Sequence, residues 1–518
     1  MLSQQAVRTV AAAGQGRRNE RGMKALQKVG RNFSVVAAAQ AVTWTATFFF
    51  TLAQARYLGP ARFAEFSLAL SYAAFLGVVV DFGLSTKLAR DVAQRPAAAG
   101  EALLATIVVR VGVWCLVMPL VWLAIVMLGY NAELQASILI LGVSLLIGGF
   151  ATSLGAYFQG REEFLVPSVG SIALRGSAAV LGVAALAVGH GVLAISIVYV
   201  VASLLQLVVM VWATRRHRIS LAAFEWRLAL DMFRGVAALG LFWMLGAFYY
   251  NVDMLILQRL APLENVAWYA AAYRLFNAAL MAVAVVAGGV LYPVVSRLSV
   301  GPREELRRAM ERTFVLLLAT GVFLALVVVV AADQLVAFLY SGREYAEAAT
   351  ALRLLTPALV GMYANGVFFL ALLGMRFDRR LLVMAAVLAV LNPLANLLVI
   401  PVLQQNGAAL TTSATELIVL AWVLALTPAD LRRAANPAAV AKILVAAVPA
   451  AACLWLLRDW PLVLGVPASA VVYGCAGLVL GILPADDRNA IRRFLARARS
   501  RVEARDAAQV VVGGPVDP

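Results

Sequence analysis

The sequence predicts an all-α polytopic membrane protein that spans the bilayer about fourteen times. The first observation is composition: 63% of the 518 residues are hydrophobic, only 14% are charged, and the mean hydropathy is +0.88. The second is the recurrence of apolar runs of about 20 to 25 residues, each long enough to cross a hydrocarbon core of ~30 Å as a helix. Barrel strands are excluded, because they alternate in polarity and are only about 10 residues long.

The apolar runs define the expected spans in chain order. They lie at residues 32–56, 66–90, 102–129, 134–158, 165–189, 191–213, 234–258, 266–296, 313–340, 346–373, 381–402, 406–427, 438–457 and 460–483. No loop between them exceeds about 20 residues, which leaves no room for a folded domain outside the membrane.

The distribution of positive charge predicts the orientation. Of the 43 Lys and Arg residues, 34 fall in the N-terminal arm, the even-numbered loops with their flanking span ends, and the C-terminal tail. The odd-numbered loops carry only Arg56, Arg62, Arg259, Arg343 and Arg458. Under the positive-inside rule, the even loops and both termini are cytoplasmic. This alternation explains the net charge of +16 without a nucleic-acid partner.

The two halves of the chain repeat each other. LGPARFAEFSLA at 58–69 corresponds to LAPLENVAWYAAA at 260–272, and Gly160 and Gly191 correspond to Gly374 and Gly407 at equivalent places in the span order. Six spans separate the copies, so both halves face the same way and the repeat is parallel. Two such bundles with a cleft between them form a common transporter plan.

This repeat predicts the domain organisation. We expect two six-helix lobes followed by two additional C-terminal spans, with an amphipathic helix and a disordered tail after them. The boundaries are a basic N-terminal arm at 1–31, an N-lobe at 32–213, a linker at 214–233, a C-lobe at 234–427, spans thirteen and fourteen at 438–483, an interfacial helix at 485–505, and the tail at 506–518.

Eight charged side chains lie more than a turn inside the expected spans. Each costs on the order of 3 kcal/mol at the bilayer centre, so each should face protein or water. They are Asp81, Arg110, Arg175, Asp253, Arg274, Asp333, Arg353 and Glu416.

Depth along the helices pairs six of these charges on adjacent spans. Asp81 and Arg110 both lie ~12–13 Å from the cytoplasmic face, and the other pairs lie at similar depths near the external face. The expected structural pairs are Asp81–Arg110, Asp253–Arg274 and Asp333–Arg353, with ion coupling as the alternative role for the acids.

Arg175 lies near the midplane without an acid at its depth on a neighbouring span. An anionic substrate explains such an arginine, so Arg175 is the first candidate for substrate binding, with Arg110, Arg274 and Arg353 after it. Arg353 could instead extend to the outer interface. Glu416 could pair with Arg175 across the two halves or carry a proton.

Two longer stretches resemble a known family. RYLGPARFAEFSLALSYAAFLGVVVDFGLSTKLAR (56–90) resembles the first loop and second helix of bacterial polysaccharide-repeat-unit flippases, which belong to the multidrug/oligosaccharidyl-lipid/polysaccharide exporter superfamily. NVDMLILQRLAPLENVAWYAAAYRLFNAA (251–279) with LYPVVSRLS (291–299) resembles the start of that family's second lobe. Asp81, Asp253 and Arg274 fall at positions characteristic of the family.

The resemblance implies a flippase that moves an undecaprenyl-diphosphate-linked oligosaccharide from the inner to the outer leaflet of the bacterial cytoplasmic membrane. It also implies glycan polymerase and glycosyltransferases as partners. No cofactor and no metal site is expected, because the sequence has no GxxxxGK[ST], HExxH or CxxC motif.

Three other functions remain open: an ion-coupled drug antiporter of the same superfamily, a membrane glycan polymerase or ligase, and a scaffold for glycan synthesis. An enzyme is not expected, since polymerases and ligases usually carry a large external loop that this chain lacks.

Overall fold

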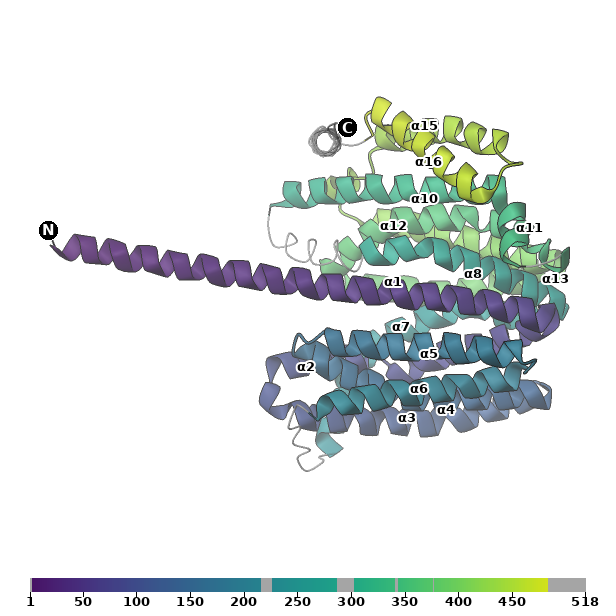
Figure 1. The fold of residues 1–518 in the computed structure, drawn as a ribbon, viewed down its shortest axis with the longest axis horizontal. Helices are drawn as coiled ribbons and strands as arrows, with labels where there is room; N and C mark the ends of the chain where they lie inside the picture. The colour runs from purple at the N-terminus through teal and green to yellow at the C-terminus, as the bar shows by residue number, and fades with distance from the viewer. Residues whose placement is uncertain (1, 216–225, 287–301, 341–342, 376, 483–518) are drawn as a thin grey trace, which may run out of the picture. The chain divides into compact units, whose positions relative to one another are not determined.

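The computed structural model describes residues 2–215, 226–286, 302–340, 343–375 and 377–482. Within these ranges the regular structure is entirely helical, as the sequence predicts (Figure 1). The helices of the N-terminal part are α1 (Leu2–Asp81), α2 (Leu84–Gln94), the 3-10 turn η1 (Pro96–Ala98), α3 (Ala99–Met127), α4 (Ala132–Gly160), α5 (Leu165–Ala187) and α6 (Val192–Thr214).

The remaining helices follow in the same manner. They are α7 (Trp226–Leu260), α8 (Leu263–Val286), α10 (Arg303–Leu339), the turn η3 (Arg343–Tyr345), α11 (Ala348–Leu354), α12 (Thr356–Gly374), α13 (Asp378–Leu426), α14 (Ala429–Arg432), α15 (Pro437–Leu456) and α16 (Leu462–Val479).

The long helices account for most of the expected spans. In the described part of the chain, 11 helical segments are long and apolar enough to cross a membrane, and two of them, Ala38–Gln94 and Arg379–Leu426, each cover two expected spans. The described helices therefore match thirteen of the expected spans. The remaining span, 266–296, corresponds to α8 as far as Val286, and its last residues lie outside the described ranges. The chain is a multi-pass membrane protein.

Local backbone breaks separate the paired spans. Gly59 has φ +70°, which glycine adopts without a Cβ clash, and the following Pro60 cannot donate to the helix ladder. Gln404 breaks α13 with φ +50°, three residues after Pro401. Both breaks fall in loops that the hydropathy pattern predicts.

The chain divides into two compact units. The first comprises Met1–Ala278, Val336–Ala351 and Leu382–Thr411, and the second comprises Ala279–Leu335, Leu352–Leu381 and Thr412–Pro518. This division by contacts differs from the lobes that the repeat predicts, and those lobes remain a prediction.

The first unit is a helical bundle around a buried core. Figure 1 shows α3, α4, α5 and α6 running side by side, and α4 packs against both α3 and α6. The core on the side of the α2 helix is formed by side chains of α2, α3, α4, α6 and α7, including Leu88, Leu103, Phe158, Met210 and Met232.

The second unit has its own core, which explains the position of the two last spans. Leu326, Val327 and Ala331 of α10 pack with Ala450 and Leu454 of α15. The hydroxyl of Tyr473 on α16 donates a hydrogen bond of 3.0 Å to the carbonyl oxygen of Ala319.

Many large apolar side chains are exposed on the outer faces of the helices, as lipid-facing residues are in a membrane protein. Examples are Leu116, Leu123, Val208 and Val448. The cysteines fit the same pattern: Cys115 and Cys475 are exposed and Cys453 is half-buried. A thiol is apolar enough for such a surface.

Some expectations fall on residues that the structure does not describe. They are the interfacial helix at 485–505, the tail at 506–518 and the central part of the linker at 214–233. The last part of that linker belongs to α7, which begins at Trp226.

Candidate functional site

The first unit contains a cavity of about 680 Å³ that is lined by residues of α1 to α6 and α8. Three of the four arginines that the sequence analysis nominates for substrate binding line it: Arg110, Arg175 and Arg274. The cavity thus collects charges from α3, α5 and α8, which are far apart in the sequence.

Helical periodicity explains why these helices form a cavity. On α6 the lining residues Tyr199, Ser203, Gln206 and Met210 recur every three or four positions and form one stripe. The corresponding stripe on α4 consists mainly of small residues, including Gly148, Gly149, Ala151, Thr152 and Gly155. Small side chains on one face leave volume that larger ones would fill.

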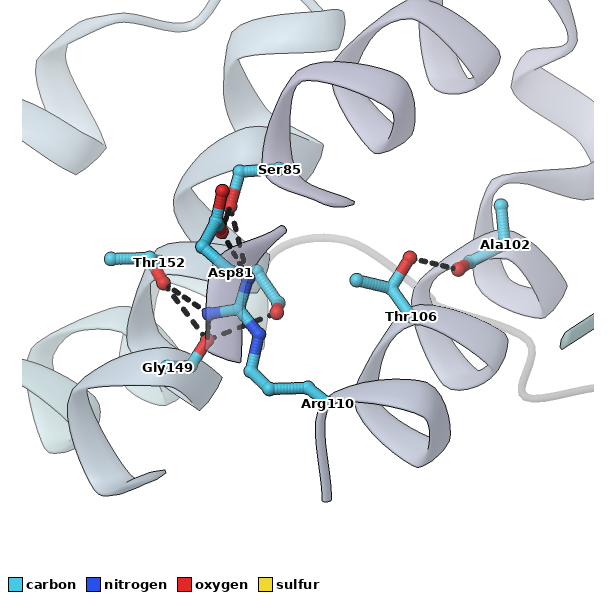
Figure 2. A network of polar contacts seen from close by, with 8 residues as sticks. Asp81, Ser85, Ala102, Thr106, Arg110, Gly149 and Thr152 are labelled. Atoms are coloured by element: carbon cyan, nitrogen blue, oxygen red, sulfur yellow. Dashed lines mark hydrogen bonds and ion pairs between the residues drawn. The ribbon is translucent and has the colours of Figure 1, made fainter. Parts of the chain in front are cut away.

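Asp81 and Arg110 form the ion pair that their depths predict. The Nη2 of Arg110 donates to Oδ1 of Asp81 at 2.5 Å and to the hydroxyl of Ser85 at 3.0 Å (Figure 2). Its Nη1 donates to the carbonyl oxygen of Gly149 and to the hydroxyl of Thr152, both at 2.6 Å. The guanidinium is therefore held by α1, α2 and α4 at once, and its side chain is only 2% exposed.

Arg175 and Arg274 differ from Arg110 in having no such partner. Neither side chain forms an ion pair or hydrogen bond with a described residue of the first unit. Arg175 is exposed and Arg274 is half-buried, and the positive charge of Arg175 acts on Arg274. Their guanidinium groups are available to an anion.

The cavity carries an excess of positive charge. Asp81 is the single carboxylate among its described lining residues, against three guanidinium groups. Since the Asp81 charge offsets that of Arg110, two positive charges remain, those of Arg175 and Arg274. Such a site favours a ligand with about two negative charges.

The expected pair between Asp253 and Arg274 is wrong in this structure. Asp253 is 4% exposed and accepts hydrogen bonds from the hydroxyl of Tyr269 and, at 2.8 Å, from the backbone N–H of Met254. Arg274 instead lines the cavity. Equal depth on adjacent helices does not specify the direction of a side chain: Asp253 contacts Tyr269, whereas Arg274 lines the cavity.

The second unit holds the other charged candidates. Asp333 and Arg353 form the expected ion pair, and Nε of Arg353 also donates to the carbonyl oxygen of Val329 at 3.2 Å. Arg353 is not among the residues that line the cavity. Glu416 is 4% exposed, with Oε2 3.5 Å from Nδ2 of Asn365. The suggested pairing of Glu416 with Arg175 remains a hypothesis.

Sequence reasoning missed several residues of the site. Ser85 lies four positions after Asp81, a helical spacing that could have indicated contact, and Thr152 follows Gly149 by one turn. Neither side chain carries a charge, so a search for charged residues inside spans does not identify them. Across the described residues, no group of His, Cys, Asp and Glu is placed to hold a metal ion.

Comparisons with known proteins agree with this architecture. A family model described as polysaccharide biosynthesis protein matches residues 29–299, which is more than half of the chain. A second model, MatE, matches residues 242–398. No curated protein sequence matches the chain.

Solved structures of transporters share the fold at low sequence identity. The lipid II flippase MurJ in an inward closed conformation is similar with a TM-score of 0.70 and 12% identity, covering 86% of this chain and 97% of that one. An inward-facing multidrug resistance transporter of the MATE family and MOP superfamily gives 0.62 and 13%, covering 75% and 97%. The Vibrio cholerae MATE transporter VcmN in the bent form gives 0.55 and 15%, covering 79% and 99%.

The family match spans the first eight expected helices and includes Asp81, Arg110, Arg175 and Arg274. The resemblance to a polysaccharide family that is seen in the sequence is thereby confirmed. The chain belongs to the polysaccharide biosynthesis protein family.

Proposed function

We propose that this protein is a flippase that moves an undecaprenyl-diphosphate-linked oligosaccharide from the inner to the outer leaflet of a bacterial cytoplasmic membrane, for the synthesis of a surface polysaccharide. The observation that carries the proposal is the cavity with two arginines, Arg175 and Arg274, that have no ion-pair or hydrogen-bond partner among the described residues of the first unit. A diphosphate diester bears two negative charges and cannot cross hydrocarbon without replacement of its water.

Arg175 and Arg274 supply that replacement. A guanidinium group donates two parallel hydrogen bonds to phosphate oxygens, which a single ammonium cannot do. Arg110 already donates four hydrogen bonds to protein partners. It therefore contributes mainly to the electrostatic potential and the shape of the cavity. The hydroxyl and amide side chains of the lining, such as Ser171, Thr152 and Gln159, offer partners for the sugar.

The extent of the cavity supports a state that is open to the cytoplasm. Gln159, Pro167 and Met210 line it within about one turn of helix ends that the charge pattern places in the cytoplasm. Toward the other side, its lining stops at Leu141 and Tyr199, roughly 10–14 Å short of the external ends of α4 and α6.

Hydrogen bonds connect α1 with the end of α10 and with η3 on the predicted external side of the first unit. Arg56 donates to the carbonyl oxygens of Leu339 at 3.0 Å and Phe338 at 2.8 Å, and the hydroxyl of Tyr345 donates to the carbonyl oxygen of Ala55 at 3.2 Å. Breaking them while the cytoplasmic side closes would give alternating access. The prenyl tail would remain in lipid as the head group crosses through the cavity.

The same charges weigh against the rival functions. A drug antiporter for cationic compounds requires a cavity of neutral or negative potential, and the cavity of the first unit is positive. A polymerase or ligase needs catalytic groups near an external acceptor, whereas the arginines lie deep in the spans.

A glycan polymerase and glycosyltransferases are expected partners, because they make and consume the transported lipid.

Export measured beside membrane abundance tests the proposal. Arg175→Ala and Arg274→Ala should leave abundance within about twofold of wild type and reduce surface glycan by at least about tenfold, the loss of one charged hydrogen-bonded contact. The matched control is Arg90→Ala, an exposed arginine of α2 outside the cavity. Normal export by both well-expressed cavity variants would contradict the proposal.

A further inference from the structure

Three buried polar side chains of the first unit lie just beyond the end of the cavity lining. Gln54 of α1 is 1% exposed, and neither Oε1 nor Nε2 of its amide has a hydrogen-bond partner among the described residues. The hydroxyls of Ser67 on α1 and Ser137 on α4, side chains that are 2% and 0% exposed, also lack a partner there. We name these three side chains the polar layer.

Each member of the polar layer continues a stripe of cavity-lining residues by one helical turn. The member and the lining residue next to it are three or four positions apart, so they share one face of their helix. The pairs of layer residue and lining residue are Gln54 and Thr51, Ser67 and Leu70, and Ser137 and Leu141. The face that lines the cavity therefore continues into the polar layer on both helices.

The three side chains also lie at similar depths. Counted at 1.5 Å per residue from the break at Gly59 or from Ala132, the first residue of α4, they lie ~7–12 Å from the predicted external ends of their helices. α1 packs against α4. The polar layer thus lies at one end of the bundle, between the cavity and the predicted external side.

Three aromatic rings pack together where the cavity lining ends. The ring centroid of Tyr199, a lining residue, is 6.1 Å from that of Phe50 and 6.2 Å from that of Phe66. Phe50 and Phe66 are buried. Gly182 of α5 allows this packing, because a Cβ on Gly182 would overlap the ring of Phe50. The end of the cavity next to the polar layer is therefore apolar and tightly packed.

The unpaired groups destabilise the state that this structure shows. A buried donor or acceptor without a partner loses its hydration without replacement, and such groups are rare in native proteins. An amide and a hydroxyl both donate and accept hydrogen bonds, as sugar hydroxyls do. The polar layer carries no charge, in contrast to the arginines of the cavity. Its chemistry therefore matches a sugar rather than a diphosphate.

We propose that the polar layer is a second binding site, for the sugar head group, which is closed in this structure and becomes accessible when the predicted external side of the first unit opens. This inference rests on the proposed function, because it takes the ligand to be a lipid-linked oligosaccharide. The sugar supplies the hydrogen-bond partners that Gln54, Ser67 and Ser137 lack. Its binding to the polar layer therefore favours the open state.

Gln54→Leu tests the proposal, because leucine fills similar space without the unpaired amide. The melting temperature of the purified full-length protein should rise by about 1–3 °C. Glycan export per membrane-inserted protein should fall about fivefold or more, because the sugar loses at least one hydrogen bond. A glutamine that only supports the fold would give a lower melting temperature and unchanged export per protein. Either of these two results would overturn the proposal.

The matched control is Gln135→Leu on α4, whose Nε2 donates to the carbonyl oxygen of Tyr130 at 2.7 Å. This variant should lower the melting temperature and keep export per protein within about twofold of wild type. Ser67→Ala combined with Ser137→Ala decides the question if Gln54→Leu does not accumulate. The double variant should not melt at a lower temperature than wild type and should export less. Lower stability or normal export of the double variant would contradict the proposal.

Thiol labelling tests whether the polar layer opens. Ser137→Cys, in a background with the three native cysteines replaced by serine, should react with a membrane-impermeant reagent added outside spheroplasts. Ser153→Cys is the control, because Ser153 is equally buried on α4 and ~24 Å farther from the predicted external end. It should not react. Absence of labelling in a Ser137→Cys protein that exports glycan would overturn the proposal.

Failure of the proposed function gives a different result. Arg175→Ala combined with Arg274→Ala would then export glycan normally, whatever Gln54→Leu does. If only the polar-layer inference fails, the arginine variants lose export while Gln54→Leu keeps it.

Discussion

The Nη1 of Arg110 donates a hydrogen bond of 2.6 Å to the carbonyl oxygen of Gly149, and a Cβ built on Gly149 would lie 2.7 Å from Cδ of Arg110. The missing side chain of Gly149 therefore makes room for a buried guanidinium against α4. This close approach connects the small-residue stripe of α4 to the charge network of the cavity.

Gly149→Ala should destabilise the protein by about 1–3 kcal/mol, because the buried Arg110 must shift from its partners. Thermal unfolding in detergent measures the loss. The control is Gly112→Ala on the helix of Arg110, where a Cβ would meet nothing within 4 Å. That control should be neutral or stabilising by up to about 1 kcal/mol. Equal melting temperatures for the two variants would contradict the packing argument.

Tyr269→Phe removes a hydrogen-bond donor from the buried carboxylate of Asp253. We expect a loss of about 1–3 kcal/mol in stability. A double-mutant cycle with Asp253→Asn should show coupling between the two positions, whereas the same cycle between Asp253→Asn and Arg274→Ala should show none. Coupling only in the second cycle would restore the pair that the sequence analysis predicts.

Neutralising Asp333 or Arg353 should change stability by at most about 1 kcal/mol, because the Asp333 side chain of this ion pair is 72% exposed. Export should stay within about twofold of wild type, a difference of less than 1 kcal/mol. Membrane abundance and surface glycan measured on both single variants check this. Loss of export in well-expressed Arg353→Ala would return Arg353 to the substrate candidates.

Arg56→Ala should weaken the closure of the predicted external end by removing two hydrogen bonds, each worth about 1 kcal/mol. The test is labelling of a Thr51→Cys reporter by a membrane-impermeant thiol reagent from outside, in a background with the three native cysteines replaced by serine. Labelling of the reporter with Arg56→Ala should be severalfold faster than labelling of the same reporter with Arg56 intact. Arg62→Ala, an exposed arginine of the same predicted loop, is the control and should label at the background rate.

Reporter fusions test the orientation on which the inward-open assignment depends. Fusions after Arg95 and Arg433 should report the cytoplasm, and fusions near Glu133 and Glu264 the external side. The reverse result would mean that the cavity opens toward the external side of the membrane.

Much of the fold follows from two simple features of the sequence. Apolar length determines the helices, so thirteen expected spans correspond to described helices. The hydropathy pattern locates the break in α1 only approximately, whereas the residues Gly59 and Pro60, which disfavour a continuous helix, mark its position. The interruption at Phe82 and Gly83 was not predicted, because the expected span at 66–90 runs through both residues.

The candidate site could be predicted only in part, for a physical reason. Depth along a helix is linear in sequence number, so Asp81 with Arg110 and Asp333 with Arg353 could be paired by counting residues. Direction around the helix depends on packing, which decides that Arg274 lines the cavity and that Asp253 contacts Tyr269. Neutral partners such as Thr152 carry no charge signal and are found only in three dimensions.

The most direct test of the account is translocation by the purified protein in vesicles. Undecaprenyl-diphosphate-linked oligosaccharide is incorporated into both leaflets, and an impermeant glycosidase outside removes the sugars it can reach. Wild-type protein should make nearly all of the lipid cleavable, whereas Arg175→Ala combined with Arg274→Ala should leave the inner half protected, as in protein-free vesicles. Protection of the inner half with the wild-type protein, or full cleavage with the folded double variant, would contradict the role of these arginines in carrying the diphosphate.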